Sequence, residues 1–82
     1  MTREEIIKDA IGLPGLNVRQ SDNGEYWFIS KTLAIAGQSV SRSIRLVQNP
    51  SPVELEMVRD AFERWEAEET ISSYNLTSEL PN

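Results

Sequence analysis

The sequence predicts an α+β domain whose elements follow the order α-β-β-β-α. Residues 16–47 read as three strands separated by two turns that contain glycine. A stretch that begins at Ser51 then carries apolar residues at steps of three and four, which is typical of an amphipathic helix. We therefore expect a three-stranded antiparallel meander with an amphipathic C-terminal helix packed on one face.

The chain of 82 residues is long enough for one hydrophobic core. We place this single α+β domain at residues 1–69. The polar remainder, residues 70–82, is expected to be a flexible C-terminal tail, with docking on the domain or on a partner as the alternative. The composition does not decide between a monomer and a homodimer.

Residues 2–11 are predicted to form the first helix. Thr2 and Glu5 have the spacing of a capping box, and Gly12 is suited to end the helix as a left-handed residue. An apolar stripe at helical spacing would cover part of the sheet, and it consists of Ile6, Ile7, Ala10 and Ile11.

Two tight turns set the predicted strand pairing. Asn23-Gly24 is the preferred pair for a two-residue type I′ turn, which would place Val18 opposite Ile29. A second two-residue turn at Gly37-Gln38 would place Ile29 opposite Leu46. Both registers put the same side chains of the middle strand on one face, so the two turns agree on which face is buried.

The two faces of the predicted sheet differ in polarity. The apolar face collects Leu16, Val18, Trp27, Ile29, Leu33, Ile35, Val40, Ile44 and Leu46, with Gln20, Lys31 and Arg42 as its polar members. We expect Lys31 and Arg42 near the margins of the sheet, with their charges in water. The outer face collects Asn17, Arg19, Ser21, Tyr26, Phe28, Ser30, Thr32, Ala34, Ser39, Ser41, Ser43, Arg45 and Val47.

The second helix has the clearest start signal. Ser51, Pro52 and Glu54 match an N-cap, a first helical position and the third position of a capping box. We expect fraying from about residue 68, where acidic residues meet the negative end of the helix dipole. The apolar stripe that would face the sheet consists of Leu55, Val58, Ala61, Phe62 and Trp65.

The residue types argue against an enzyme. The chain has no Cys and no His, which removes thiolate chemistry, Cys-based zinc sites and the commonest general base. No phosphate-binding glycine loop is present, and exposed glutamates lack the burial that acid–base catalysis needs. We therefore expect no catalytic residue, no metal and no cofactor. With neither a signal peptide nor an apolar run of membrane length, the expected location is the cytoplasm.

Charge is unevenly distributed along the chain. Residues 1–48 carry a net charge of +1 and residues 49–82 a net charge of −6. The outer sheet face is the first candidate binding surface, because aromatic side chains stand there among arginines: Arg19, Tyr26, Phe28 and Arg45. The acidic face of the second helix is the other candidate, and it consists of Glu56, Asp60, Glu63 and Glu66.

These surfaces predict a small non-enzymatic protein-interaction or regulatory domain whose partner is another protein. A nucleic-acid-binding module that uses the outer sheet face is the alternative, although a net charge of −5 disfavours it. A third reading is an acidic inhibitor whose carboxylates mimic the phosphate backbone. No membrane partner is expected.

The order of elements resembles that of the double-stranded-RNA-binding fold, and a sheet covered by one helix is similar to the arm-binding domains of phage-type integrases. The first resemblance implies a lysine-rich loop at the start of the second helix. This chain has NPSPVELE there, without Lys or Arg. The likeness therefore concerns architecture, and no binding residues are carried over from either family.

Overall fold

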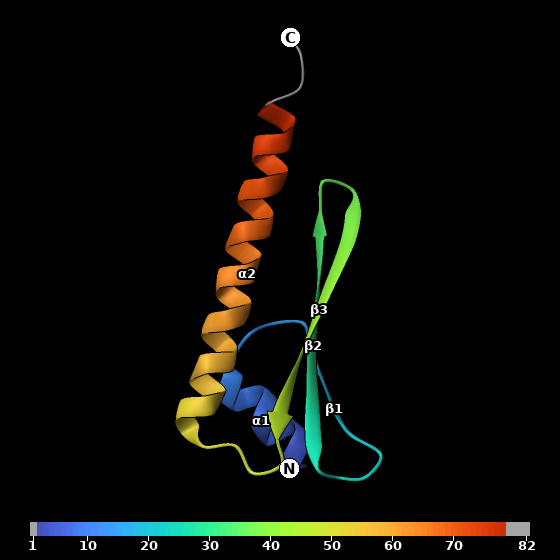
Figure 1. The fold of residues 1–82 in the computed structure, drawn as a ribbon, viewed down its shortest axis with the longest axis vertical. Helices are drawn as coiled ribbons and strands as arrows, with labels where there is room; N and C mark the ends of the chain where they lie inside the picture. Colours follow the sequence, from blue (N-terminus) through green and yellow to red (C-terminus); the bar gives the residue numbers. More distant parts are fainter. Residues whose placement is uncertain (1, 79–82) are drawn as a thin grey trace.

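The computed structural model describes residues 2–78, and the side chains of residues 2–72. The three strands form one antiparallel sheet in the order β1-β2-β3, with α2 in contact with the sheet (Figure 1). The predicted α+β meander is confirmed. Its elements are α1 (Arg3–Ile11), β1 (Leu16–Gln20), β2 (Tyr26–Ile35), β3 (Gln38–Val47) and α2 (Pro52–Ser78).

Both helices begin at the caps that the sequence predicts. Thr2 Oγ1 accepts the backbone N–H of Glu5 at 3.2 Å, and left-handed Gly12, with a φ of 73°, ends α1. At the start of α2, Ser51 Oγ accepts the N–H of Glu54 at 3.2 Å. Glu54 Oε1 accepts the N–H of Ser51 at 3.2 Å in return, so the capping box is complete.

The first hairpin has the predicted register but not the predicted turn. Val18 lies opposite Ile29, as expected. A type I′ turn needs a positive φ at both central residues, and Asn23 does not have one, whereas Gly24 has a φ of 74°. The type I′ prediction at Asn23-Gly24 is therefore wrong.

Side-chain hydrogen bonds explain this turn. Asn23 Oδ1 accepts the Glu25 N–H at 3.1 Å and the Ser21 hydroxyl at 2.7 Å, while the Gly24 N–H donates to Ser21 O at 2.9 Å. Asn side chains that bond to nearby backbone in this way compete with a regular two-residue turn. The register survives because the Ser21 N–H still donates to Tyr26 O at 2.9 Å, across the longer loop.

The second turn lies at Ala36-Gly37, so the predicted position at Gly37-Gln38 is wrong by one residue. Ala36 and Gly37 have φ values of 53° and 79°, which gives the two positive values of a type I′ turn, with glycine in the second central position. Ile29 consequently pairs with Ile44 instead of Leu46. Because the pairing moves by two residues, each side chain keeps its predicted face.

Both helices pack on the inner face of the sheet, where the core lies. Its fully buried side chains come from α1, β2 and α2, and they are Ile11, Trp27, Ile29 and Phe62. Val58 and Trp65 of α2 are also buried, and Leu55 packs against them, as predicted. In α1 only Ile7 and Ile11 of the predicted stripe are buried, because Ile6 is 51% exposed and Ala10 faces solvent.

Lys31 departs from the expected position at a wet margin. It is buried on the inner face of the central strand, whereas Arg42, directly opposite on β3, is exposed. The Lys31 ammonium donates to the carbonyl oxygen of Pro14 at 2.7 Å. A buried ammonium needs such a partner, and the loop between α1 and β1 supplies it.

The second helix is longer than predicted. Instead of fraying from residue 68 it continues to Ser78, and the Thr70 hydroxyl donates to Glu66 O at 2.8 Å. A dipole penalty of a few tenths of a kcal/mol per glutamate is too small to end a helix. The last turns project beyond the tip of the β2–β3 hairpin (Figure 1). The predicted domain limit at residue 69 and the flexibility of the tail stay predictions, and residues 79–82 lie outside the described part.

Candidate interaction face of the sheet

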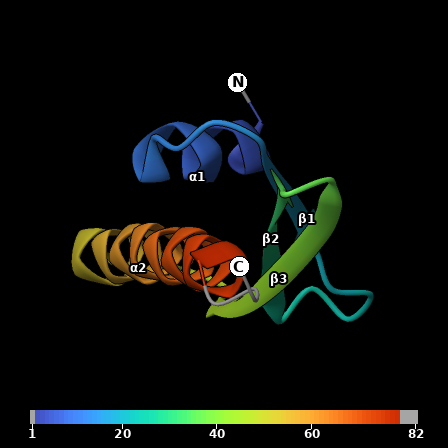
Figure 2. The same cartoon turned by 90° about the horizontal axis from the view of Figure 1, so that it is seen from above.

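The outer face of the sheet is open. Figure 2 shows α1 and α2 on the same side of the strands, with no helix of the described chain on the other side. The core agrees with this view, because Ile7 and Ile11 of α1 belong to the same cluster as Trp27 and Phe62. The first helix therefore does not cover Tyr26 and Phe28.

The strand register brings the four predicted residues of the outer face together. Arg19 lies directly opposite Phe28, and Phe28 lies directly opposite Arg45. The guanidinium carbon of Arg19 is 5.4 Å from the centre of the Phe28 ring. The guanidinium carbon of Arg45 is 4.6 Å from the centre of the Tyr26 ring. We call these four residues, Arg19, Tyr26, Phe28 and Arg45, the arginine–aromatic row.

The row presents two positioned cations. Strand spacing places the Cα atoms of Arg19 and Arg45 about 10 Å apart, one on each side of Phe28. Both arginines are exposed, whereas Tyr26 and Phe28 are half-buried. A guanidinium that rests on a ring can still donate two parallel hydrogen bonds to a carboxylate or a phosphate. Its restricted motion reduces the entropy that binding would cost.

Hydroxyl groups surround the row, and carboxylates are missing from it. Ser30 and Ser43 lie directly opposite each other on the same face, and the hydroxyls of Thr32 and Ser41 are 2.8 Å apart. None of the residues of β1, β2 and β3 is Asp or Glu. The outer face therefore offers hydrogen-bond donors and positive charge, which suits an anionic surface.

The acidic helix face is less uniform than predicted. Glu56, Asp60 and Glu63 are exposed on α2, but Glu66 is half-buried. Glu63 Oε1 accepts a hydrogen bond from Arg59 Nε at 2.8 Å, so part of its charge is compensated within the helix. Three of the four predicted carboxylates thus share a solvated face, and nothing else in the described structure points to a ligand there.

The described residues include neither a cluster of metal-ligating side chains nor a membrane-spanning helix. Among them, no group of three or more Asp or Glu side chains is placed to hold a metal. In the same part of the chain, no helix combines the length and the apolar character that crossing a bilayer requires.

One polar cluster was not predicted. The carbonyl oxygen of Gln48 accepts both the Trp27 Nε1–H at 2.9 Å and an N–H of Arg3 at 3.0 Å. Arg3 also donates to Asn49 Oδ1 at 2.8 Å, and its guanidinium carbon lies 5.5 Å from the Trp27 ring centre. These hydrogen bonds join residues 21 to 46 positions apart, so no local sequence pattern could reveal them.

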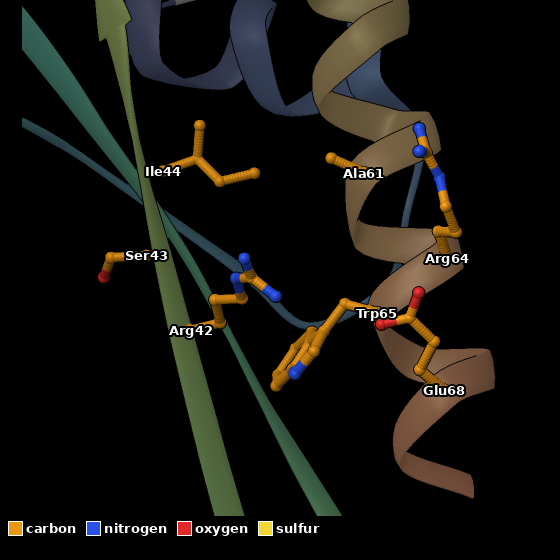
Figure 3. Close-up of a pocket in the computed structure, with 7 residues that line it drawn as sticks. All are labelled: Arg42, Ser43, Ile44, Ala61, Arg64, Trp65 and Glu68. Carbon is orange, nitrogen blue, oxygen red and sulfur yellow. The ribbon is translucent and has the colours of Figure 1, made fainter. Parts of the chain in front are cut away.

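A groove separates β3 from α2. Its wider part has a volume of about 460 Å³, and an adjoining apolar part of about 250 Å³ is lined by Ile44, Leu46, Glu54, Met57, Val58 and Ala61. In Figure 3 Arg42 and Ile44 point from β3 toward the helix, whereas Ser43 points away. Trp65 extends from α2 into the same space.

Comparison with family models, with curated proteins and with solved structures finds no match. The expected likeness to the double-stranded-RNA-binding fold and to the integrase arm-binding domains thus stays a likeness in the arrangement of elements.

Proposed function

We propose that the chain is a small non-enzymatic interaction domain that binds an acidic segment of a partner protein through the outer face of its sheet. The observation that carries this proposal is the open arginine–aromatic row on strands without carboxylates. Interfaces are enriched in arginine and in aromatic residues, and the row joins both in one small patch.

The charge distribution supports a protein partner over a polyanion. Among the described residues, the arginines of the open face are Arg19 and Arg45, and the whole chain has a net charge of −5. Non-specific affinity for nucleic acid rises with the number of phosphates that are neutralised, so two cations give a weak electrostatic contribution. Two arginines do suffice to fix the position of a short acidic segment through paired hydrogen bonds.

Nucleic-acid binding is the second candidate, because the row also interleaves cations with aromatic rings. Exposed aromatic residues stack on unpaired bases, and arginines contact phosphates, in sheet-based binders. The rings of Tyr26 and Phe28 lie beneath guanidinium groups, so a base would first have to displace an arginine.

A capture experiment tests the leading proposal. The immobilised chain and its Arg19→Ala/Arg45→Ala variant are exposed to an extract of the native host, and retained proteins are identified by mass spectrometry. We expect at least one protein that the wild type retains and the double variant loses. The control is Arg64→Ala, an exposed arginine of α2, which should keep that protein. A retained set that is the same for wild type and double variant would contradict the proposal.

Fluorescence anisotropy with labelled single-stranded and duplex DNA and RNA, at low and high salt, tests the second candidate. Binding that weakens with salt and disappears in the double variant would reverse our ordering of the two candidates. The absence of binding at low salt would remove nucleic acid from consideration.

A further inference from the structure

We infer that two copies of the chain pair antiparallel through the free edge of β3, around a two-fold axis at Ser43. This inference goes beyond the proposed function, because it concerns the edge of the sheet and not its outer face. It rests on three features: an unpaired edge, a hairpin whose distal half has no third strand, and a register that sets Val40 opposite Leu46 and no arginine opposite its own copy.

The edge of β3 is long, and its one inward-facing charge is Arg42. β3 spans ten residues and pairs with β2 alone. No backbone hydrogen bond in the described structure joins β3 to any other element. Edge strands are normally kept short, bulged or interrupted by proline, since a row of unpaired N–H and C=O groups binds other strands. β3 has no proline, and its ten residues pair one-to-one with β2 without a bulge.

The distal half of the β2–β3 hairpin lacks a third strand. β1 ends its pairing at Lys31, so residues 32–35 of β2 and 38–41 of β3 form a two-stranded ribbon. Isolated two-stranded ribbons are marginally stable in water. A second β3, placed antiparallel along the free edge, would add the missing strand to this ribbon in both copies.

The pleat limits the possible registers. Because a two-residue turn closes with a hydrogen-bonded pair, the hydrogen-bonding groups of residues 39, 41, 43, 45 and 47 face away from β2. Two-fold pairing centred on Arg42 or Arg45 would set an arginine opposite its own copy, which is unfavourable. Pairing centred on Ser43 joins residues 39–47 of both copies. It sets Arg45 opposite Ser41 and Arg42 opposite Ile44.

The groove beside β3 complements this register. Val40 of the second copy would lie opposite Leu46, and Arg42 of the second copy opposite Ile44. Leu46 and Ile44 line the apolar groove of about 250 Å³, together with Met57, which is 63% exposed. The groove also contains Glu54. Val40 of the second copy would therefore meet apolar surface, and Arg42 of the second copy would lie near a carboxylate.

Two copies joined in this way would extend the outer face across six strands. The arginine–aromatic rows of both copies would lie on one continuous surface, which doubles the number of arginines presented there. The inference thus gives a reason why two cations per chain are enough for a larger acidic partner.

Sedimentation equilibrium and symmetric cross-linking test the inference. We expect the full chain to reach twice its mass of 9.3 kDa as concentration rises. The chain has no cysteine, so Ser43→Cys introduces a single thiol. At the two-fold axis the two Cα atoms would be about 5.5 Å apart, within the range that a disulfide spans. Ser43→Cys should therefore form a disulfide-linked dimer on mild oxidation.

Ser41→Cys is the matched control for the register, because two copies of residue 41 would lie about 13 Å apart along the strands, too far for a disulfide. A chain that stays at 9.3 kDa at every concentration would overturn the inference. So would equal cross-linking of Ser41→Cys and Ser43→Cys, since it would reveal random collisions.

Charge substitutions give a second, independent readout. In the inferred register residue 41 of each copy faces Arg45 of the other copy, which gives two such pairs in a dimer. Ser41→Glu should therefore tighten the dimer, and Ser41→Lys should weaken it. Two cross-strand pairs of this kind change Kd by about 2- to 30-fold in each direction. Asn17→Glu and Asn17→Lys, on the exposed outer face of the opposite edge strand, should change Kd less than the Ser41 variants. Equal effects at both positions would contradict the inference.

Discussion

The inner and outer faces of the sheet both carry aromatic residues but use them differently. On the inner face Trp27 is 1% exposed, and its ring is packed in the core with Ile29 and Phe62. On the outer face Tyr26 and Phe28 lie next to it in sequence, yet they are half-buried and meet arginine side chains in place of core residues. Adjacent aromatic residues of one strand thus stabilise the core on the inner face and contact exposed arginines on the outer face.

The burial of a ring, and not its presence, decides what the ring contributes to stability. The two helices are both committed to the inner face, so nothing in the described fold depends on covering the outer face (Figure 2). If the division is correct, the same substitution should have very different effects on the two sides.

The largest difference is expected between two phenylalanines. Phe62→Ala removes a fully buried ring and should lower the free energy of unfolding by about 3–5 kcal/mol. Phe28→Ala removes a half-buried ring from the outer face and should cost about 1 kcal/mol. Urea unfolding followed by circular dichroism measures both. Equal losses in the two variants would show that the outer face belongs to the stabilising core.

The second-largest loss of stability is expected at the contacts that join the N-terminus to the end of the sheet. Arg3→Ala removes two hydrogen bonds to Gln48 and Asn49 and a contact with the Trp27 ring, and we expect a loss of about 1–2 kcal/mol. Arg64→Ala, which removes an exposed arginine from α2, should change the free energy of unfolding by less than about 0.5 kcal/mol. If Arg3→Ala lowered the free energy of unfolding no more than Arg64→Ala, these contacts would not stabilise the fold in solution.

These two faces also separate what the sequence could predict from what it could not. Local signals were sufficient for the helix caps at Thr2 and Ser51, because capping involves residues three positions apart. The alternation of apolar residues was sufficient for the composition of each face. Neither signal could show that α1 packs on the inner face, because this packing depends on contacts between Ile11 and a core to which α2 also contributes.

The two turns show a further limit of sequence patterns. Asn23-Gly24 predicted a type I′ turn, but side-chain hydrogen bonds to Asn23 favour a longer loop. Ala36-Gly37 forms a type I′ turn although alanine does not favour a positive φ. Pairing along two ten-residue strands outweighs the local preference of one alanine. The candidate residues of the outer face were nevertheless predicted, because an error of two residues leaves each side chain on its face.

The strain at Ala36 gives the next prediction. Ala36→Asn restores the Asn-Gly pair that type I′ turns prefer, and it should raise the free energy of unfolding by about 0.5–1 kcal/mol. Ala36→Ser adds a polar atom without the tolerance of Asn for a left-handed backbone, and it should leave the stability nearly unchanged. Equal stability of Ala36→Asn and Ala36→Ser in urea unfolding would contradict a cost of the left-handed backbone at residue 36.

A similarly small effect, of opposite sign, is expected from the arginines of the outer face. Arg45→Ala removes a guanidinium 4.6 Å from the Tyr26 ring centre, and an exposed contact of this kind contributes about 0.5–1 kcal/mol. Arg19→Ala should cost no more, because its guanidinium lies farther from the Phe28 ring, at 5.4 Å. Thermal unfolding should therefore show both variants folded, with midpoints close to that of the wild type. Neither arginine contacts the core, so a loss of partner binding in these folded variants can be assigned to the outer face. Unfolding of either variant would show that the outer face also stabilises the fold.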